Sequence, residues 1–95
     1  MANSTPGSGK IRVLIVDDIT ETRENIKKLV YFEDDIEVIG MASNGNEGIE
    51  LAGRLEPDVV LMDINMPGMD GIAASQAISV KHPNVQVIMM SVQSE

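Results

Sequence analysis

Short apolar runs separated by polar segments characterise the chain from residue 11 onward. Four of these runs are too short for an ordinary helix, and each predicts a buried strand, at 11–16, 36–42, 59–63 and 85–90. The segments between them repeat apolar residues at helical spacing and predict helices at 20–32, about 45–55 and 71–81. Strands that alternate with short helices predict an α/β fold with a parallel sheet and right-handed crossovers.

The sequence also indicates where one predicted helix begins and ends, and which side of another faces the sheet. Asn44, followed three residues later by Glu47, is typical of a helix start, and Pro57 ends that helix. In the first helix we expect Thr22 and three apolar residues on the inner face and four charged residues outside. The apolar residues are Ile26, Leu29 and Val30, and the charged ones are Arg23, Glu24, Lys27 and Lys28.

Polar side chains follow three of the predicted strands at their carboxyl ends. Asp17 and Asp18 follow the first strand, Asp63 ends the third, and Ser91 follows the fourth. Ligands in open α/β sheets bind outside the carboxyl ends of the strands. Three crowded carboxylates repel one another unless a cation joins them, and Mg²⁺ prefers oxygen ligands. The pattern therefore predicts a divalent cation held by Asp17, Asp18, Asp63 and a backbone carbonyl near Asn65.

Each of these residues also has a plainer interpretation. Asp17 and Asp18 are suited to capping the first helix, and Asp63 alone to a turn. Ser91 alone is typical of a loop. The functional interpretation rests on finding these residues together at one edge of the sheet. A carboxylate such as Asp63 can attack phosphorus and form an acyl phosphate. Such a transfer needs a metal to neutralise the phosphoryl oxygens, and a hydroxyl at Ser91 could donate a hydrogen bond to one of them.

Composition narrows the classes of protein that remain. The 95 residues suffice for one small domain, and the net charge of −8 disfavours direct binding to nucleic acid or to an anionic membrane. The chain has no cysteine, which excludes disulfides and thiolate metal sites, and no apolar stretch long enough to span a membrane. Residues 1–10 are rich in Ser, Gly and Pro and predict a disordered leader without a signal peptide. We expect a cytoplasmic protein.

Three segments together resemble the receiver domain of two-component response regulators. They are Leu14-Ile15-Val16-Asp17-Asp18, the stretch from Leu61 through Asn65-Met66-Pro67-Gly68-Met69-Asp70 to Gly71, and Val87-Ile88-Met89-Met90-Ser91. The resemblance covers residues 11–95 and implies a flavodoxin-like fold with five parallel strands in the order 2-1-3-4-5. This chain supplies four strands, order 2-1-3-4, so we expect a truncated receiver domain without the last helix-strand-helix unit.

The resemblance also implies a role for each site residue. Asp63 would be the phosphoacceptor that takes a phosphoryl group from a histidine kinase. Asp17 and Asp18 would bind Mg²⁺, and Asn65 would add its backbone carbonyl. Ser91 would be the switch hydroxyl. No other cofactor is implied, and the module would not be an enzyme beyond catalysing its own phosphorylation and dephosphorylation.

The chain departs from the family pattern beyond the fourth strand. The family's lysine and switch aromatic on the fifth strand have no counterpart here, and none of the seven Lys and Arg residues lies at a strand end that could replace the lysine. The fourth strand would also become an exposed apolar edge, which is a template for pairing. We therefore expect a homo-oligomer, with a two-fold dimer favoured, formed through this strand.

Three functions remain open from the sequence. The first is the phosphoacceptor module described above. The second is a self-associating assembly module that keeps the receiver scaffold without phosphorylation switching. The third is a hydrolase of the haloacid dehalogenase type, which also uses a strand-end aspartate. The third is disfavoured because Asn65 occupies the place of that family's second aspartate.

Overall fold

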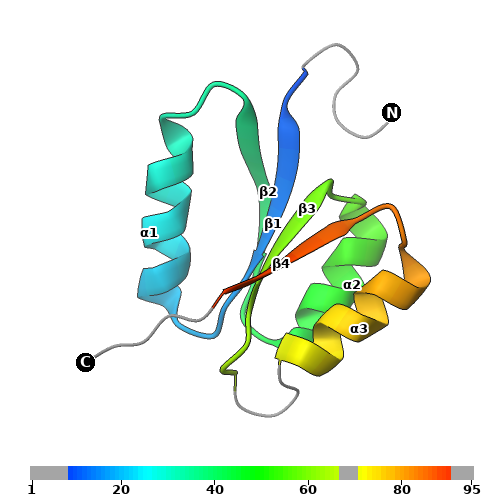
Figure 1. The fold of residues 1–95 in the computed structure, drawn as a ribbon. Helices are drawn as coiled ribbons and strands as arrows, with labels where there is room; N and C mark the ends of the chain where they lie inside the picture. The colour runs from blue at the N-terminus through cyan, green and yellow to red at the C-terminus, as the bar shows by residue number, and fades with distance from the viewer. Residues whose placement is uncertain (1–8, 67–70, 91–95) are drawn as a thin grey trace.

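The computed structural model describes residues 9–66 and 71–90 of the chain. Within them, four strands form one parallel sheet in the order β2-β1-β3-β4, which confirms the predicted topology (Figure 1). The strands are β1 at Ile11–Val16, β2 at Ile36–Ala42, β3 at Val59–Asp63 and β4 at Gln86–Met90. Ser91 and residues 1–8 of the expected leader lie outside the described residues, so the structure does not test those predictions.

The helices lie on both sides of the sheet. Helix α1 (Thr20–Tyr31) lies on one side, and α2 (Gly45–Leu55) and α3 (Gly71–Lys81) lie on the other (Figure 1). The chain moves from β1 to β2 in one direction and from β2 back across β1 to β3 in the other. Because both crossovers are right-handed by rule, α1 and α2 must lie on opposite faces. The reversal makes the carboxyl edge between β1 and β3 the topological switch point, where ligands bind in such sheets.

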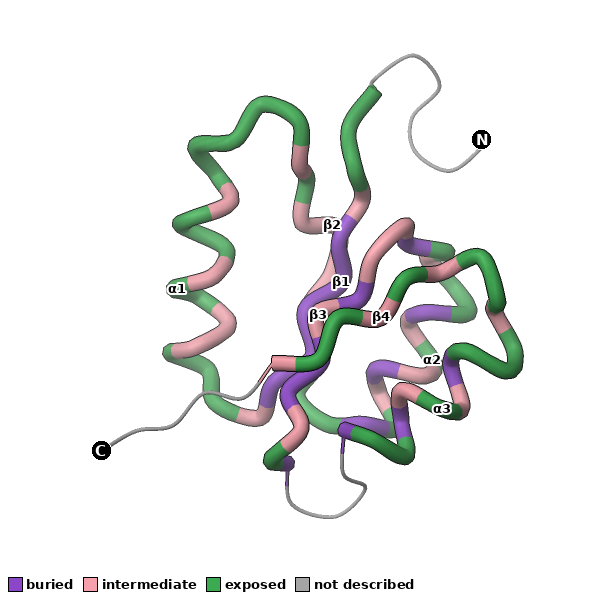
Figure 2. The backbone as a smooth tube through the Cα atoms, viewed as in Figure 1, coloured by how far each residue is buried: buried purple, intermediate pink, exposed green. Residues whose placement is uncertain are grey.

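The two central strands form the best-packed part of the molecule. Leu14, Ile15, Val16, Val60 and Met62 are all 0% exposed. The main core joins β1 and β3 to the inner sides of α2 and α3, where Ala52, Ala74 and Ile78 are also fully buried. Figure 2 shows this concentration of buried residues around β1 and β3. The two strands that end in the acidic residues are therefore held from both neighbouring strands and from the helices behind them.

Helix α1 is less buried than its sequence predicts. It ends at Tyr31 with Phe32 as its C-cap, one residue earlier than expected, and none of its residues is fully buried. The prediction that Leu29 faces the sheet is wrong, because its side chain is 73% exposed. The helix packs mainly against β2, and in residues 9–66 and 71–90 no second helix lies beside it on that face. One strand cannot cover the whole apolar stripe of the helix.

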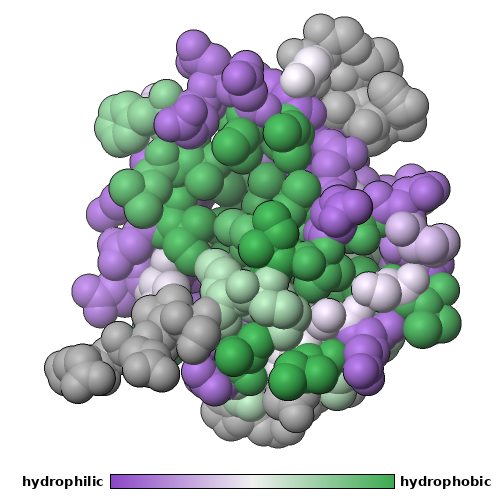
Figure 3. Space-filling view, in the orientation of Figure 1, coloured by the Kyte–Doolittle hydropathy of each residue, from purple (hydrophilic) through white to green (hydrophobic). Residues whose placement is uncertain are grey.

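Strand β4 forms an exposed edge of the described sheet. It begins at Gln86, one residue later than predicted, because the Val85 N–H donates to the His82 carbonyl in the preceding turn. Ile88 is 51% exposed and Met89 is 39% exposed. Figure 3 shows apolar residues gathered over the middle of the view, in the region of α1 and β4, with hydrophilic residues around them. An apolar sheet edge of this kind is a surface suited to pairing.

No helix in the described part of the chain is both long and apolar enough to cross a membrane.

Candidate acidic site

Three carboxylates meet at the switch point between β1 and β3. One carboxylate oxygen each from Asp17, Asp18 and Asp63 can be chosen so that all lie within 4.8 Å of one another. Val16 pairs with Met62 in the parallel ladder, so the residues that follow each of them emerge side by side. Asp17 is 1% exposed and Asp63 is 4% exposed, whereas Asp18 is half-buried. The structure thus places two buried carboxylates and one more accessible carboxylate together.

Hydrogen bonds fix Asp17 at the end of β1. Its N–H donates to the Ala42 carbonyl of β2 at 3.0 Å, and its carboxylate accepts from the Ile19 N–H at 2.8 Å. This second bond forms an Asx-type turn. The N-cap of α1 is Ile19, without a side-chain capping bond, so neither Asp17 nor Asp18 is the N-cap residue. The two aspartates therefore lie in the turn between β1 and α1, and the bonds of Asp17 hold that turn at the end of the strand.

Asp63 is held in a similar way at the end of β3. Its Oδ1 atom accepts from the Asn65 N–H at 2.9 Å, and the next residue, Ile64, donates its N–H to the Met90 carbonyl at 3.0 Å. Asn65 itself is exposed. An ionised carboxylate offers about four lone-pair directions, so one backbone bond leaves Asp63 with further acceptor capacity.

A glycine allows α3 to begin directly behind Asp63. Gly71 is buried, and a Cβ atom built on it would lie 2.0 Å from the Asp63 carbonyl oxygen and 2.7 Å from the Ile64 Cα atom. These are backbone atoms, which cannot move aside without displacing the strand end. The sequence predicted that a helix begins at Gly71, and the structure shows that the missing side chain is what allows this close approach.

The electrostatic environment raises the pKa of the Asp17 carboxyl above its ordinary value of 3.8. Burial is the largest cause, and repulsion from Asp63 and Asp18 adds to it. The hydrogen bond from Ile19 and the nearby Arg23 guanidinium act in the opposite direction. The ionised form of Asp17 is therefore disfavoured in the folded protein, and a bound cation would offset that penalty.

Arg23 corrects one prediction made from the helical pattern. The sequence placed its side chain on the outer face of α1 with Lys27. In the structure the side chain is half-buried and turns back toward the strand end. Its Nη1 donates to the Asp17 carbonyl at 2.6 Å, and its Nη2 donates to the Thr20 hydroxyl at 3.0 Å. A positive side chain in the first helical turn interacts unfavourably with the helix dipole. This unfavourable position was the feature of the sequence that could have indicated a role for Arg23 outside the helix.

The donor set fits a hard divalent cation. The converging groups are all carboxylates, and Mg²⁺ takes oxygen ligands, usually one or two carboxylates together with waters. Asp17, Asp18 and Asp63 could hold such an ion, with the Asn65 carbonyl as a further oxygen. The predicted hydroxyl of Ser91 and residues 67–70 of the adjoining loop lie outside the described residues.

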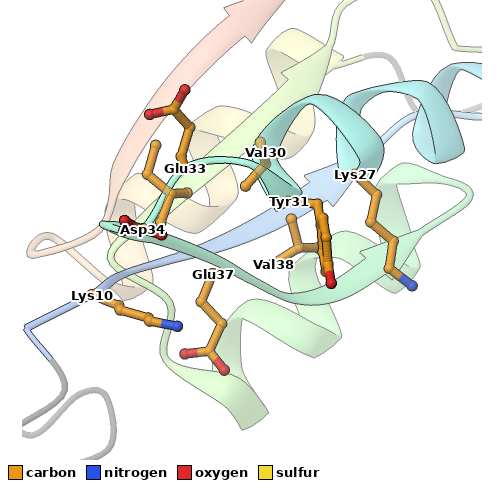
Figure 4. Close-up of a pocket in the computed structure, with 9 residues that line it drawn as sticks. Lys10, Lys27, Val30, Tyr31, Glu33, Asp34, Glu37 and Val38 are labelled. Carbon is orange, nitrogen blue, oxygen red and sulfur yellow. The ribbon is translucent and has the colours of Figure 1, made fainter.

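A hollow lies at the opposite edge of the sheet from the acidic cluster (Figure 4). Its volume is about 270 Å³, and its lining includes Lys10, Tyr31, Glu37 and Val38. It adjoins the start of β2, whereas the acidic cluster adjoins the carboxyl ends of β1 and β3. Lysines and carboxylates both line it, and it contains none of the three clustered aspartates.

The strand order and the acidic switch point define a flavodoxin-like α/β domain, and comparison with known proteins gives its family. A family model described as the response regulator receiver domain matches residues 13–95. The chain therefore belongs to the receiver domain family of response regulators.

Similar proteins support this assignment. The nitrate/nitrite response regulator NarL of Escherichia coli K12 is 39% identical over 92 residues, which are 97% of this chain and 41% of that protein. A protein-glutamate methylesterase of Carboxydothermus hydrogenoformans is 46% identical over 82 residues, 86% of this chain and 23% of that protein. The chain thus spans less than half of these curated relatives.

Solved structures agree in fold. The response regulator domain of Thermotoga maritima CheB superposes with a TM-score of 0.82 at 42% identity, covering 90% of this chain and 63% of that one. The receiver domain of NarL from Mycobacterium tuberculosis also gives 0.82, at 32% identity, covering 90% of this chain and 69% of that one.

Proposed function

We propose that this chain is a phosphoacceptor module of a cytoplasmic two-component system, in which Asp63 takes a phosphoryl group from a histidine kinase. The observation that carries this proposal is the convergence of Asp17, Asp18 and Asp63 at the switch point of a receiver fold. A site built only for stability would not gather three carboxylates, two of them buried, without a cation to offset their repulsion.

The chemistry is a transfer between two nucleophiles. A carboxylate oxygen of Asp63 attacks phosphorus, the bond from phosphorus to the kinase imidazole breaks, and that nitrogen leaves with the electron pair. Mg²⁺ held by Asp17, Asp18, Asp63 and the Asn65 carbonyl would neutralise charge on the phosphoryl oxygens. In this proposal the Ser91 hydroxyl donates a hydrogen bond to one of those oxygens. The chain's share is to fix Asp63 and shield it within the strand end.

Intact mass spectrometry tests this function. The folded chain is incubated with Mg²⁺ and phosphoramidate, a small donor that also carries a P–N bond. We expect one phosphoryl adduct on the parent, none on Asp63→Asn, and none on the parent in excess EDTA. The matched control Asp34→Asn, which alters an exposed carboxylate in the turn before β2, should keep the adduct. An adduct that persists on Asp63→Asn, or no adduct on any folded variant, contradicts the function.

A second candidate function has an observation of its own. Ile88 and Met89 are exposed on the edge strand β4, and an exposed apolar edge is suited to pairing with a second copy of the chain. We propose, as the alternative, that the chain acts as an assembly module that associates through β4 without phosphorylation switching.

Sedimentation equilibrium tests the alternative. It predicts a dimer for the parent and a monomer for Ile88→Lys, because a lysine on a sheet edge opposes pairing. Val80→Lys is the matched control, since Val80 is 81% exposed and lies on helix α3 rather than on the edge strand β4. A parent that sediments as a compact monomer and unfolds cooperatively contradicts the alternative.

A further inference from the structure

In the described part of the chain, Arg23 is a basic residue whose side chain reaches the acidic strand ends. Its guanidinium joins two groups of the β1–α1 connection, the Asp17 carbonyl at 2.6 Å and the Thr20 hydroxyl at 3.0 Å. The planar fork of arginine suits such a paired contact, because two donors have a fixed spacing. A flexible point charge such as lysine cannot reproduce it.

The position of Arg23 costs stability within its own helix. It lies in the first turn of α1, and its N–H donates to the carbonyl of Ile19, the N-cap residue. The positive end of the helix dipole is directed at that turn, which favours acidic rather than basic side chains. The Arg23 side chain nevertheless folds back onto the backbone of the preceding turn. We take this contact as a sign that Arg23 stabilises a part of the structure outside its own helix.

That benefit lies in the peptide unit between Asp17 and Asp18. The carbonyl bound by Arg23 shares a rigid plane with the Asp18 N–H, so holding the oxygen fixes the plane. The other polar groups of Asp17 are also bonded, its N–H to Ala42 and its carboxylate to Ile19. The fixed plane places the Cα atom of Asp18, and the bond from the Ile19 N–H to the Asp17 carboxylate restrains the peptide on its other side. Together they restrict the direction in which the Asp18 side chain leaves the backbone, and its carboxylate lies beside that of Asp63.

We infer that Arg23 is a positioning residue for the metal site: its guanidinium holds the Asp17–Asp18 peptide plane so that the Asp18 carboxylate is presented to the cation. This role rests on the proposed function. It does not make Arg23 a ligand or a contact of the phosphoryl group, because its guanidinium bonds to the Asp17 carbonyl and to the Thr20 hydroxyl.

Calorimetric titration of Mg²⁺ into metal-free protein distinguishes positioning from charge. Groups that orient a metal ligand typically alter affinity by about 10-fold or more when removed. We therefore expect Arg23→Lys and Arg23→Gln both to weaken Mg²⁺ binding by about 10-fold. Thr20→Val, which removes one anchor of the fork, should weaken it less. Arg54→Gln is the matched control, since Arg54 is 69% exposed on α2 and pairs only at 3.7 Å with Glu50, and it should bind like the parent.

A purely electrostatic role predicts the opposite pattern. Removing a positive charge would then tighten Mg²⁺ binding in Arg23→Gln and leave Arg23→Lys unchanged, and that result overturns the inference. Amide hydrogen exchange at Asp18 and Ile19 without metal supplies a second readout, which should quicken in Arg23→Lys and in Thr20→Val. If the Arg23 variants fail to fold, Thr20→Val decides, and parent-like exchange and affinity overturn the inference.

The same titration separates this inference from the proposed function. A parent that binds no Mg²⁺ contradicts the function and, with it, the role of Arg23. A parent that binds Mg²⁺ through Asp18, shown by loss of binding in Asp18→Asn, together with unaltered Arg23 variants, contradicts only the role of Arg23.

Discussion

Asp17 occupies a position that favours the uncharged carboxyl group in the metal-free protein. Burial raises its pKa above 3.8, and the neighbouring Asp63 and Asp18 act in the same sense. A carboxyl with a raised pKa binds its proton more tightly in the folded than in the unfolded state. The metal-free protein should therefore lose stability as pH rises from the unfolded pKa of Asp17 through the folded one.

Replacing Asp17 by Asn should reverse this loss. The amide oxygen can still accept from the Ile19 N–H, but no charge is buried. In EDTA at neutral pH we expect Asp17→Asn to melt at a higher temperature than the parent, with the difference vanishing toward acid pH. Saturating Mg²⁺ should stabilise the parent and affect the variant little. A variant less stable than the parent in EDTA at neutral pH would contradict this reading.

Gly71 makes the packing of α3 on the strand end sensitive to a single methyl group. A Cβ atom there would lie 2.0 Å from the Asp63 carbonyl oxygen, so Gly71→Ala must displace backbone. We expect a loss of about 1–3 kcal/mol in the free energy of unfolding, as for overpacking, together with weaker Mg²⁺ binding.

Gly53→Ala is the matched control for Gly71→Ala. Its Cβ would meet nothing nearer than the His82 Nε2 atom at 3.6 Å, and it lies within α2. It should gain about 0.5–1 kcal/mol from helix propensity. Urea unfolding measures both changes, and a Gly71→Ala protein as stable as the parent would show that the strand end is not constrained as described.

The acidic residues could be placed from the sequence, whereas Arg23 could not. Asp17, Asp18 and Asp63 follow apolar strands, and the carboxyl ends of neighbouring parallel strands must emerge at one edge. Arg23 lies at an outward position of the helical pattern, and its long side chain reaches back past its own turn. Helical periodicity predicts where a Cα atom lies, but not where a flexible guanidinium finds acceptors.

At the scale of elements, the start of α2 is specified by its own residues. Asn44 is the N-cap, and its side-chain oxygen accepts from the Glu47 N–H at 2.8 Å, as the sequence predicted. The Glu47 carboxylate reaches back to Ser43, accepting from its N–H at 2.8 Å and its hydroxyl at 3.0 Å. These bonds, the backbone one first, hold the pKa of Glu47 below its ordinary 4.5.

The cap of α2 gives a prediction with a pH dependence. Asn44→Ala should cost about 1 kcal/mol of unfolding free energy, while Asn46→Ala, at an exposed position within the helix, should change it little. Because the folded pKa of Glu47 is depressed, its contribution is present above 4.5 and is lost as pH falls through the folded value. Glu47→Gln should therefore be less stable than the parent at neutral pH and equal to it in acid. A constant difference across pH would contradict the assignment.

Helix α1 shows that a sequence pattern can predict a helix without predicting which of its apolar residues are buried. Its apolar spacing correctly predicts a helix that packs on the sheet, but Leu29 is exposed because the helix meets mainly β2. An amphipathic pattern indicates which residues can be buried. It does not say how much of that stripe finds a neighbour, which depends on the elements beside it.

At the scale of the whole molecule, the described residues cover the two sheet faces unequally, with two helices on one face and α1 alone on the other. Helices α2 and α3 close one side with a continuous core, whereas exposed apolar residues remain near α1 and β4. The parallel pairing was predicted from the alternation of strands and helices, whereas the strand order was predicted from the resemblance to receiver domains. The extent of the open surface could not be read from any single element.

The open surface provides the test between the two candidate functions. A phosphoacceptor module should change its association when Asp63 is modified, whereas a constitutive assembly module should not. Sedimentation before and after treatment with phosphoramidate and Mg²⁺ measures this, with Asp63→Asn as the control. Equal, strong association of all samples would favour the assembly module.

The most direct test is to locate the phosphoryl group. Borohydride reduces an aspartyl phosphate to homoserine, so tandem mass spectrometry of the treated and reduced chain identifies the acceptor residue. We predict a single Mg²⁺-dependent conversion at Asp63, with Asp17 and Asp18 unchanged. A chain that stays folded yet shows conversion elsewhere, or none at all, would contradict the assignment of the acidic cluster as a phosphoacceptor site.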